Sequence, residues 1–155
     1  MGIEHFMDKA VKLAVDNVKK GGGPFGAVIV KDGEVVASGT NRVTAENDPT
    51  AHAEVKAIRE ACSKLRTFDL SGCTIYTSCE PCPMCFSAIY WAHLDAVYYA
   101  ADHHDAAKAG FDDAFIYDEI KKQPGERKIN FKKLDFEQHF QPFADWISNE
   151  NKTKY

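Results

Sequence analysis

The chain contains 155 residues, of which 45% are hydrophobic and 27% are charged. This mixture is typical of a globular protein, and the length suits a single domain. No apolar run is long enough to cross a membrane, and the start, Met1–His5, lacks the basic and apolar regions of a secretory signal. The formal net charge of −4 argues weakly against an extended nucleic-acid surface, which usually carries a basic patch.

The first element that the pattern predicts is an amphipathic helix over residues 4–18. Its apolar side chains recur at helical spacing: Phe6, Ala10, Leu13, Ala14 and Val18. Lys19 and Lys20 follow this stripe, and Gly21–Gly23 come directly after them. Lysine suits the last turn of a helix and glycine suits its C-cap, so we expect the helix to end there.

Two strands joined by a tight turn are expected next. Residues 24–30 form an apolar run that predicts a buried strand, and residues 34–39 return as its partner. Asp32–Gly33 between them is a strong hairpin signal because both turn positions need a positive φ angle. Asn41 lies just past the second strand, where an asparagine is more often a turn residue than a ligand contact.

A third segment carries His52, Ala53 and Glu54 at the start of a predicted helix. Its apolar positions are three, four and three residues apart, which indicates one core-facing stripe: Val55, Ile58, Cys62 and Leu65. Side chains two apart on a helix do not face each other. His52 and Glu54 should therefore lie in the frayed first turn, with only the histidine directed at a metal.

A strand predicted over residues 73–78 leads to a second motif, Pro81–Cys85. Cys82 and Cys85 are three residues apart, so they share a face if a helix starts there. Pro83 suits the first helical position, where its missing N–H costs nothing, and this makes Cys82 the N-cap. The positive helix end would favour thiolates. The apolar side of this helix is predicted to carry Phe86, Ile89 and Tyr90.

Together, His52, Cys82 and Cys85 offer one imidazole and two thiolates to Zn²⁺. Three protein ligands leave the fourth position for water, as in a catalytic centre, whereas a structural site needs a fourth ligand. A hydroxide made from that water near neutral pH requires a nearby base, and Glu54 is the candidate. The H-x-E and P-C-x-x-C motifs, in this order, match the known signature of zinc deaminases that act on nucleobases.

Other interpretations of these motifs stay open. They can occur in a structural zinc site with an unseen fourth ligand, or in a binding module that zinc stabilises without turnover. Glu54 argues against both, since a structural site needs no base. Cys79 and Cys82 also form a C-x-x-C pair, as in thioredoxin-like redox sites, although such sites need no His-x-Glu motif.

The remaining cysteines indicate the compartment. Cys62, Cys73 and Cys79 lie outside the zinc motif, which leaves an odd number for pairing. In a chain without a secretory signal, this pattern favours a reducing compartment over a disulfide framework. We therefore expect a cytoplasmic protein.

The C-terminal part is less regular. Residues 95–100 predict a fourth strand, residues 131–136 a fifth, and residues 106–109 a short helical turn ended by Gly110. A final amphipathic helix is predicted over residues 137–149. This helix carries Phe140, Phe143, Trp146 and Ile147. Strands that alternate with helices predict a three-layer α/β/α sandwich with a mixed five-stranded sheet.

Several polar and aromatic residues have an ordinary explanation on sequence alone. The adjacent His103 and His104 are expected to be solvated, and we assign them no role. Asp112 and Asp113 are more often exposed turn formers than catalytic groups. Trp91, at a helix end, is more often a core residue than a stacking wall.

Four stretches resemble the bacterial guanine deaminases, which belong to the cytidine-deaminase-like fold family: residues 24–30, 52–54, 78–85 and 106–113. All branches of that family share the zinc motifs, whereas the last stretch and Tyr155 point to guanine. The resemblance implies one zinc per chain with a catalytic water, held by His52, Cys82 and Cys85. It also implies catalytic roles for Glu54 and Asp113. The implied contacts to the base are Phe25, Asn41, Ala53, Trp91 and Tyr155.

The implied activity is hydrolytic deamination of guanine to xanthine and ammonia. Glu54 would pass a proton from the zinc-bound water to N3 while hydroxide attacks C2, and Asp113 would help to protonate the departing amine. The rivals are a tRNA adenosine deaminase, which acts on a flipped base, and a cytosine or nucleoside deaminase. We expect a purine base as the partner, and neither a membrane nor a nucleic acid.

The resemblance also implies a dimer. We expect a single zinc-dependent deaminase domain over residues 1–155, in which residues 138–155 are exchanged between the two chains of a homodimer. A polar run such as residues 148–155 would otherwise fray. Exchange of an identical element is a low-cost route to a symmetric dimer, and the exchanged segment would cap the partner's pocket.

Overall fold

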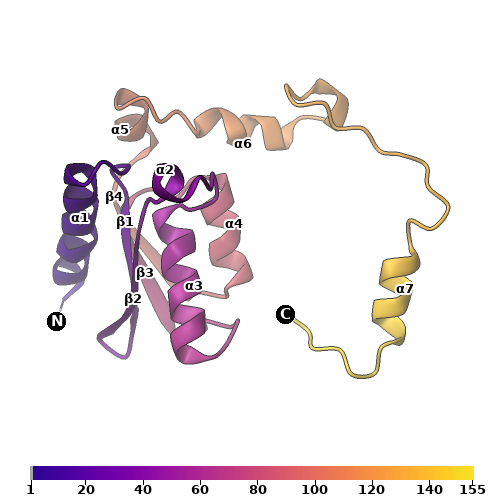
Figure 1. Ribbon diagram of the computed structural model, residues 1–155, viewed down its shortest axis with the longest axis horizontal. Helices are drawn as coiled ribbons and strands as arrows, with labels where there is room; N and C mark the ends of the chain where they lie inside the picture. The colour runs from indigo at the N-terminus through magenta and orange to yellow at the C-terminus, as the bar shows by residue number, and fades with distance from the viewer. Residues whose placement is uncertain (1) are drawn as a thin grey trace. The chain divides into compact units, whose positions relative to one another are not determined.

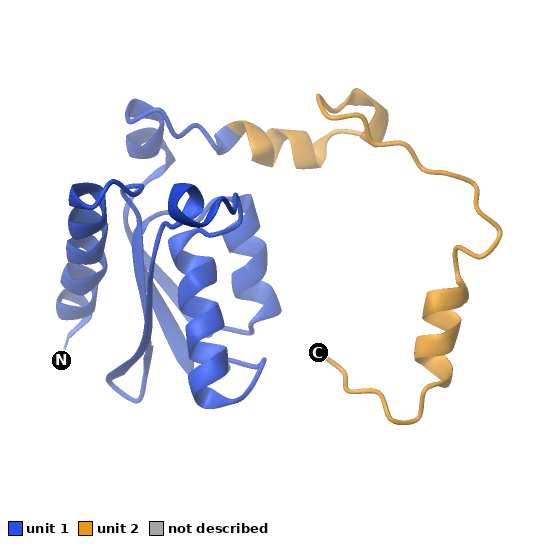
Figure 2. Ribbon diagram, viewed as in Figure 1, with its two compact units in different colours: residues 1–114 blue, residues 115–155 orange. Residues whose placement is uncertain are grey.

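The computed structural model describes residues 2–155. Met1, which begins the segment Met1–His5 predicted to lack a secretory signal, lies outside the described residues. The chain divides after residue 114 into two compact parts, which we call unit 1 (residues 2–114) and unit 2 (residues 115–155) (Figure 2). Within residues 2–155, no helix combines the length and apolar composition that a membrane span requires.

Unit 1 is built on a sheet with the strand order β2-β1-β3-β4. These strands are β1 (Gly26–Lys31), β2 (Glu34–Thr40), β3 (Cys73–Cys79) and β4 (Ala96–Ala101). Strand β1 pairs antiparallel with β2 and β3, while β3 and β4 are parallel. Asp32 and Gly33 both have positive φ angles, as the predicted hairpin turn requires.

The prediction of a fifth strand is wrong. Across the described residues the sheet contains four strands, and residues 131–136 have no regular secondary structure. The apolar residues there are Phe131, Leu134 and Phe136, which alternation would place on both faces of a strand. No single buried face therefore selects a strand at this position.

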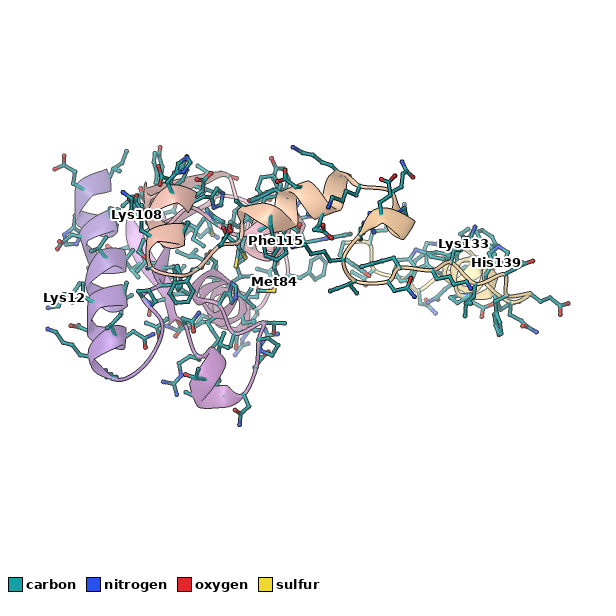
Figure 3. The ribbon with its side chains drawn as sticks, turned by 90° about the horizontal axis from the view of Figure 1, so that it is seen from above. Lys12, Met84, Lys108, Phe115, Lys133 and His139 are labelled. Carbon is teal, nitrogen blue, oxygen red and sulfur yellow. The ribbon has the colours of Figure 1, made fainter. Side chains whose placement is uncertain are left out.

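Helices cover both faces of the sheet (Figure 1). Helix α1 (Ile3–Lys19) packs on one face, and α3 (Ala53–Leu65) and α4 (Pro83–Trp91) lie on the other. Figure 3 shows Lys12 on the side of α1 that points away from the sheet. The predicted three-layer α/β/α arrangement is therefore confirmed, with a mixed sheet of four strands in place of five.

Glycines let the helices approach the sheet closely. A Cβ atom at Gly26 would meet the backbone of α1 at the Ala10 carbonyl oxygen, and one at Gly39 would meet the Ala53 carbonyl oxygen of α3. The most buried face of α3 is accordingly built from small side chains, such as Ala57 and Ala61. The predicted stripe of larger residues, which includes Val55, is only partly buried.

Helix α1 differs from its predicted stripe at one position. Val18 is exposed, and the neighbouring Asn17 is buried instead. The Asn17 amide nitrogen donates to the carbonyl oxygens of Gly23 at 2.8 Å and Asn41 at 2.9 Å. This polar side chain is therefore buried because it joins the loop after α1 to the end of β2.

The other elements are α2 (Val43–Glu46), α5 (His103–Lys108), α6 (Ala114–Lys121), the 3-10 helix η1 (Pro124–Glu126) and α7 (Gln141–Ser148). Helix α5 fits the predicted turn, and Gly110 follows it with a positive φ angle. Helix α7 begins later than predicted because Pro142 is accommodated in a first turn but not in a helix interior.

Candidate metal centre and active site

A hydrogen-bonded loop places His52 at the start of α3. The Thr50 backbone N–H and hydroxyl donate to the Asp48 carboxylate at 2.9 and 2.7 Å, and the Arg42 N–H donates to the Ala51 carbonyl oxygen at 2.9 Å. His52 is the extended N-cap residue of the helix. The predicted position of His52 at the frayed helix start is therefore observed.

Two cysteines occupy the start of α4. Cys82 is the N-cap, Pro83 stands in the first turn, and Cys85 lies almost one turn further on. The backbone N–H of Glu80 donates to the Ala101 carbonyl oxygen at 2.8 Å, which attaches the preceding loop to the end of β4. The N-termini of α3 and α4 thus converge on one point.

The three predicted metal ligands meet there. The Nδ1 atom of His52 lies 3.4 Å from the Cys82 sulfur and 3.5 Å from the Cys85 sulfur, and all three ligand atoms lie within 4.8 Å of one another. Tetrahedral zinc, with bonds of about 2.0–2.1 Å to nitrogen and 2.3 Å to sulfur, separates such atoms by about 3.6 Å. In the described part of the chain, the group includes no fourth ligand. The one nitrogen and two sulfur donors fit tetrahedral zinc and leave one coordination position for a non-protein ligand.

The three side chains of the metal group differ in how their pKa values are shifted. The pKa of Cys82 is lowered to about 4, chiefly because Cys85 donates a hydrogen bond to it. The same contact, together with burial, raises the pKa of Cys85. The pKa of His52 is raised, first by its hydrogen bond with Cys82. Metal binding requires deprotonated ligands, so a bound cation would take the place of these protons.

Glu54 lies beside the metal group without belonging to it. It stands in the first turn of α3, its side chain is buried, and burial raises the pKa of its carboxyl group. The carboxyl group lies within hydrogen-bonding reach of Cys85. A buried acid of this kind next to a metal site is the arrangement that general acid–base catalysis requires.

Asp113 lies near the same centre. Its charge contributes to the raised pKa of His52, and its carboxylate lies 3.0 Å from Nδ1 of His103, which makes an ion pair when the imidazole is protonated. Asp112 is exposed, as expected, and accepts a hydrogen bond from the Ala114 N–H at 3.2 Å. The two neighbouring carboxylates therefore have different surroundings, although the sequence does not separate them.

His103 is a residue that the sequence analysis missed. Expected to be solvated, it is only 20% exposed and contacts both Asp113 and Glu80. No local pattern marks it, because its partners lie 10 and 23 residues away along the chain. Only the tertiary fold brings them together.

Phe25 packs against the segment that carries Asp113, and its backbone is bonded to Asn41. The Phe25 ring packs edge-on against Phe111, with 5.1 Å between ring centroids. The Asn41 N–H donates to the Phe25 carbonyl oxygen at 3.2 Å, and the Asn41 side-chain oxygen accepts from Val43 at 3.2 Å. Ala53, between His52 and Glu54, is fully buried. Phe111 lies in the predicted stretch 106–113, but was not singled out.

Two further aromatic residues, Trp91 and Tyr155, were expected to contact the base. Trp91 is 66% exposed, so its interpretation as a core residue is wrong. It ends the nine-residue helix α4, about 13 Å along the axis from Cys82 and about 9 Å from Cys85. Tyr155 belongs to unit 2, where its ring lies 6.3 Å from that of Trp146. Both residues therefore need a different explanation from the others.

Cys79 does not behave as a redox cysteine. Burial raises the pKa of its thiol to about 11, and its sulfur lies 3.7 Å from the Asp102 carbonyl oxygen. Cys82 belongs to the metal group with His52 and Cys85, which favours a metal ligand over a redox partner of Cys79.

Comparison with known proteins supplies the class. Residues 2–101 match the family model described as the cytidine and deoxycytidylate deaminase zinc-binding region. The chain therefore belongs to this family of zinc-dependent deaminases. It is 57% identical to the guanine deaminase of Bacillus subtilis, over 100% of both chains. The X-ray structure of the Bacillus subtilis enzyme superposes with a TM-score of 0.98, covering 100% of this chain and 99% of that one.

More distant relatives share part of the chain. A structure of guanine deaminase from Nitrosomonas europaea is 34% identical with a TM-score of 0.70, covering 83% of this chain and 69% of that one. A tRNA-specific adenosine deaminase from Aquifex aeolicus is 44% identical over 65% of this chain and 67% of its own. The similarity thus extends to relatives whose names indicate different substrates.

Proposed function

We propose that this protein hydrolyses guanine to xanthine and ammonia. The observation that carries the proposal is the full-length similarity to the guanine deaminase of Bacillus subtilis, at 57% identity. The match to the Aquifex aeolicus tRNA deaminase leaves about a third of this chain uncovered. The net charge of −4 also favours a small purine base over a nucleic acid.

In this proposal, His52, Cys82 and Cys85 hold one zinc ion. When bound there, zinc lowers the pKa of a water molecule and makes it a nucleophile near neutral pH. Glu54 accepts a proton at the metal centre and returns it to N3 of the base. The buried position of Glu54 supports this role, because burial raises the pKa of its carboxyl group towards the range in which it can accept and release a proton.

The remaining polar groups bind the base and complete the reaction. Asp113 lies by the 2-amino group and assists its departure as ammonia. Asn41 donates from its side-chain amide to the purine, since its oxygen is occupied by Val43. Phe25, supported by Phe111, forms one wall, and the buried Ala53 lies at the floor.

We further propose a homodimer in which residues 138–155, with the rest of unit 2, are exchanged between chains. No side chain in residues 115–155, all of which the structure describes, is buried. In unit 1, helix α4 exposes Phe86, Tyr90 and Trp91 by 47%, 69% and 66%. Apolar surface of this extent usually marks an interface. The partner's unit 2 covers this side of α4, and Trp91 contributes to the contact.

The exchange makes the chain one functional domain. In this arrangement Tyr155 of one chain lies over the base bound by the other and limits access of water to it. The full-length match supports a single domain over residues 1–155, because the relative aligns across both units. Five unpaired cysteines, Cys62, Cys73, Cys79, Cys82 and Cys85, support a cytoplasmic or other reducing compartment.

A substrate panel tests the proposal. Zinc-loaded protein is incubated separately with guanine, guanosine, adenine, cytosine and a tRNA anticodon stem-loop, and released ammonia is measured. We expect ammonia from guanine at the highest rate, with one xanthine formed per ammonia. Faster release from the stem-loop would identify a tRNA deaminase, and release from cytosine alone would identify a pyrimidine deaminase. Glu54→Gln serves as the inactive control for each substrate.

A further inference from the structure

The imidazole of His103 lies between two carboxylates. Its Nδ1 atom is 3.0 Å from Oδ1 of Asp113, and its Nε2 atom is 3.3 Å from Oε2 of Glu80. The three side chains are between 20% and 30% exposed, so solvent screens these contacts only in part. One ring therefore links the segment that carries Asp113 to the loop that precedes the zinc cysteines.

Two of the three residues are attached to rigid structure. The Glu80 N–H donates to the Ala101 carbonyl oxygen at 2.8 Å, which joins the ends of β3 and β4. His103 is the first residue of α5, whose start is closed by a reciprocal capping box between Asp102 and Asp105. The imidazole thus projects from a fixed helix start towards a fixed strand end.

Asp113 is the member with the least local support. It lies between α5 and α6, where residues 109–113 form no helix or strand. Its Oδ1 atom is buried and accepts no hydrogen bond from the described residues. Its 3.0 Å contact with Nδ1 of His103 compensates the negative charge when the imidazole is protonated. A buried carboxylate without compensation is costly and would turn towards water.

We propose that His103 is a positioning residue that holds the Asp113 carboxylate in the active site, with Glu80 fixing the other side of the ring. The inference rests on the proposed role of Asp113 in guanine deamination. A ring nitrogen that contacts one carboxylate sets the orientation of the nitrogen that faces the other. In this proposal His103 acts through Asp113 and not directly on the metal or the base.

Kinetics of four variants test this inference. His103→Ala should lower kcat for guanine by about 10²-fold, since small misplacements of a reacting group have effects of this size. KM and zinc content should stay within about twofold of wild type, because base binding and metal ligands are untouched. His103→Gln, whose amide can still donate to one carboxylate, should recover part of the rate. His104→Ala, at the exposed neighbouring position, should behave as wild type.

A double-mutant cycle separates positioning from a general structural role. If His103 acts through Asp113, the double variant His103→Ala/Asp113→Asn should be no slower than Asp113→Asn alone. The inference would be overturned if the two substitutions lowered kcat independently, so that their fold-losses multiplied in the double variant. It would also be overturned if His103→Ala and His103→Gln had the same kcat as His104→Ala. Should His103→Ala fold poorly, the His103→Gln variant completes the same cycle.

A readout that does not depend on the substrate separates this inference from the proposed function. In a crystal structure of zinc-loaded His103→Ala, we expect the Asp113 carboxylate to leave its place in the site. An unmoved carboxylate would overturn the inference even if guanine is the substrate. If instead the wild type releases no ammonia from guanine, the proposed function fails, and the cycle is repeated with the substrate that the panel identifies.

Discussion

Units 1 and 2 are both rich in large apolar side chains, but only unit 1 buries them. In unit 1, Ile29, Leu70 and Ile75 are fully buried between the sheet and the helices. In unit 2, every large apolar side chain of the following set is more than a third exposed: Phe115, Ile116, Ile120, Ile129, Phe131, Leu134, Phe136, Phe140, Phe143, Trp146, Ile147 and Tyr155. Apolar composition therefore does not by itself produce a core.

The difference separates two sources of structure. Unit 1 has a sheet with helices packed on both faces. Its own residues therefore bury a core, which defines the fold and places the metal ligands. Unit 2 consists of helices and connections with no sheet to cover, and it gains little apolar burial by itself. Its conformation makes physical sense when another surface buries these side chains, as the proposed exchange provides. In the proposed dimer, the chemistry belongs to unit 1 and enclosure of the substrate to the partner's unit 2.

The largest expected effect is on the metal centre of unit 1. Cys85→Ala should reduce bound zinc from about one per chain to near zero and abolish ammonia release, because one of three protein ligands is lost. Metal analysis of the purified protein measures this directly. Cys62→Ala, which changes a cysteine on the partly buried side of α3, should retain zinc. Full zinc occupancy in Cys85→Ala would show that the ligand set is wrong.

The second largest effect shows whether Glu54 is a general base or a zinc ligand. Glu54→Gln should keep zinc and lower kcat by about 10²–10⁴-fold, since it removes a proton shuttle and no metal bond. Zinc content and kcat are measured on the same preparation. Glu60→Gln, on the same helix, should leave both unchanged, because its amide oxygen can still accept from the Ser38 N–H. Loss of zinc from Glu54→Gln would make Glu54 a ligand instead.

Much of this centre was predictable because its signals are local. The spacing of Cys82 and Cys85 and the place of Pro83 define a helix start whatever the surroundings, and His52 and Glu54 occupy the first turn of another helix. Such short-range patterns fix dihedral angles and helix caps. The sequence therefore predicted the four strands of unit 1, the layers that cover them and the metal group.

The errors concern contacts between distant segments. Asn17 is buried in place of Val18 because carbonyl oxygens from two loops reach it, and no helical periodicity records them. His103 contacts Glu80 and Asp113 only after β4 and α5 have been placed. Trp91 is exposed at the end of α4, although its position in an apolar helix suggested a core residue. These are properties of the tertiary structure.

The next effect compares how tightly the atoms are packed within unit 1 and within unit 2. Gly39→Ala should lower the free energy of unfolding by about 1–3 kcal/mol, because the new Cβ atom would meet the Ala53 carbonyl oxygen of α3 and backbone cannot easily move aside. Gly125→Ala, in unit 2, should change it by less than about 0.5 kcal/mol, since a Cβ atom there has no neighbour within 4 Å. Urea unfolding of the zinc-loaded variants measures both. Equal losses would contradict the contrast between the units.

The smallest effect asks whether unit 2 contributes to the site at all. Removal of Tyr155 should leave zinc content and the dimer intact but lower kcat/KM for guanine about tenfold, the size of one aromatic contact. Tyr155→Phe keeps the ring and should retain most of the rate. Wild-type kinetics after removal of Tyr155 would mean that the residue has no part in enclosing the base.

Complementation then shows which chain the tyrosine serves. The Glu54→Gln protein keeps Tyr155 but lacks the catalytic carboxylate. The Tyr155-deleted protein keeps Glu54 but lacks the tyrosine. If segments are exchanged, co-refolding the two in equal amounts gives half mixed dimers, each with one complete site, so about a quarter of wild-type activity should return. If Tyr155 instead covers the site of its own chain, no mixed dimer contains a complete site. Activity per total protein would then stay at about half that of the Tyr155-deleted protein alone, and the exchange would be excluded.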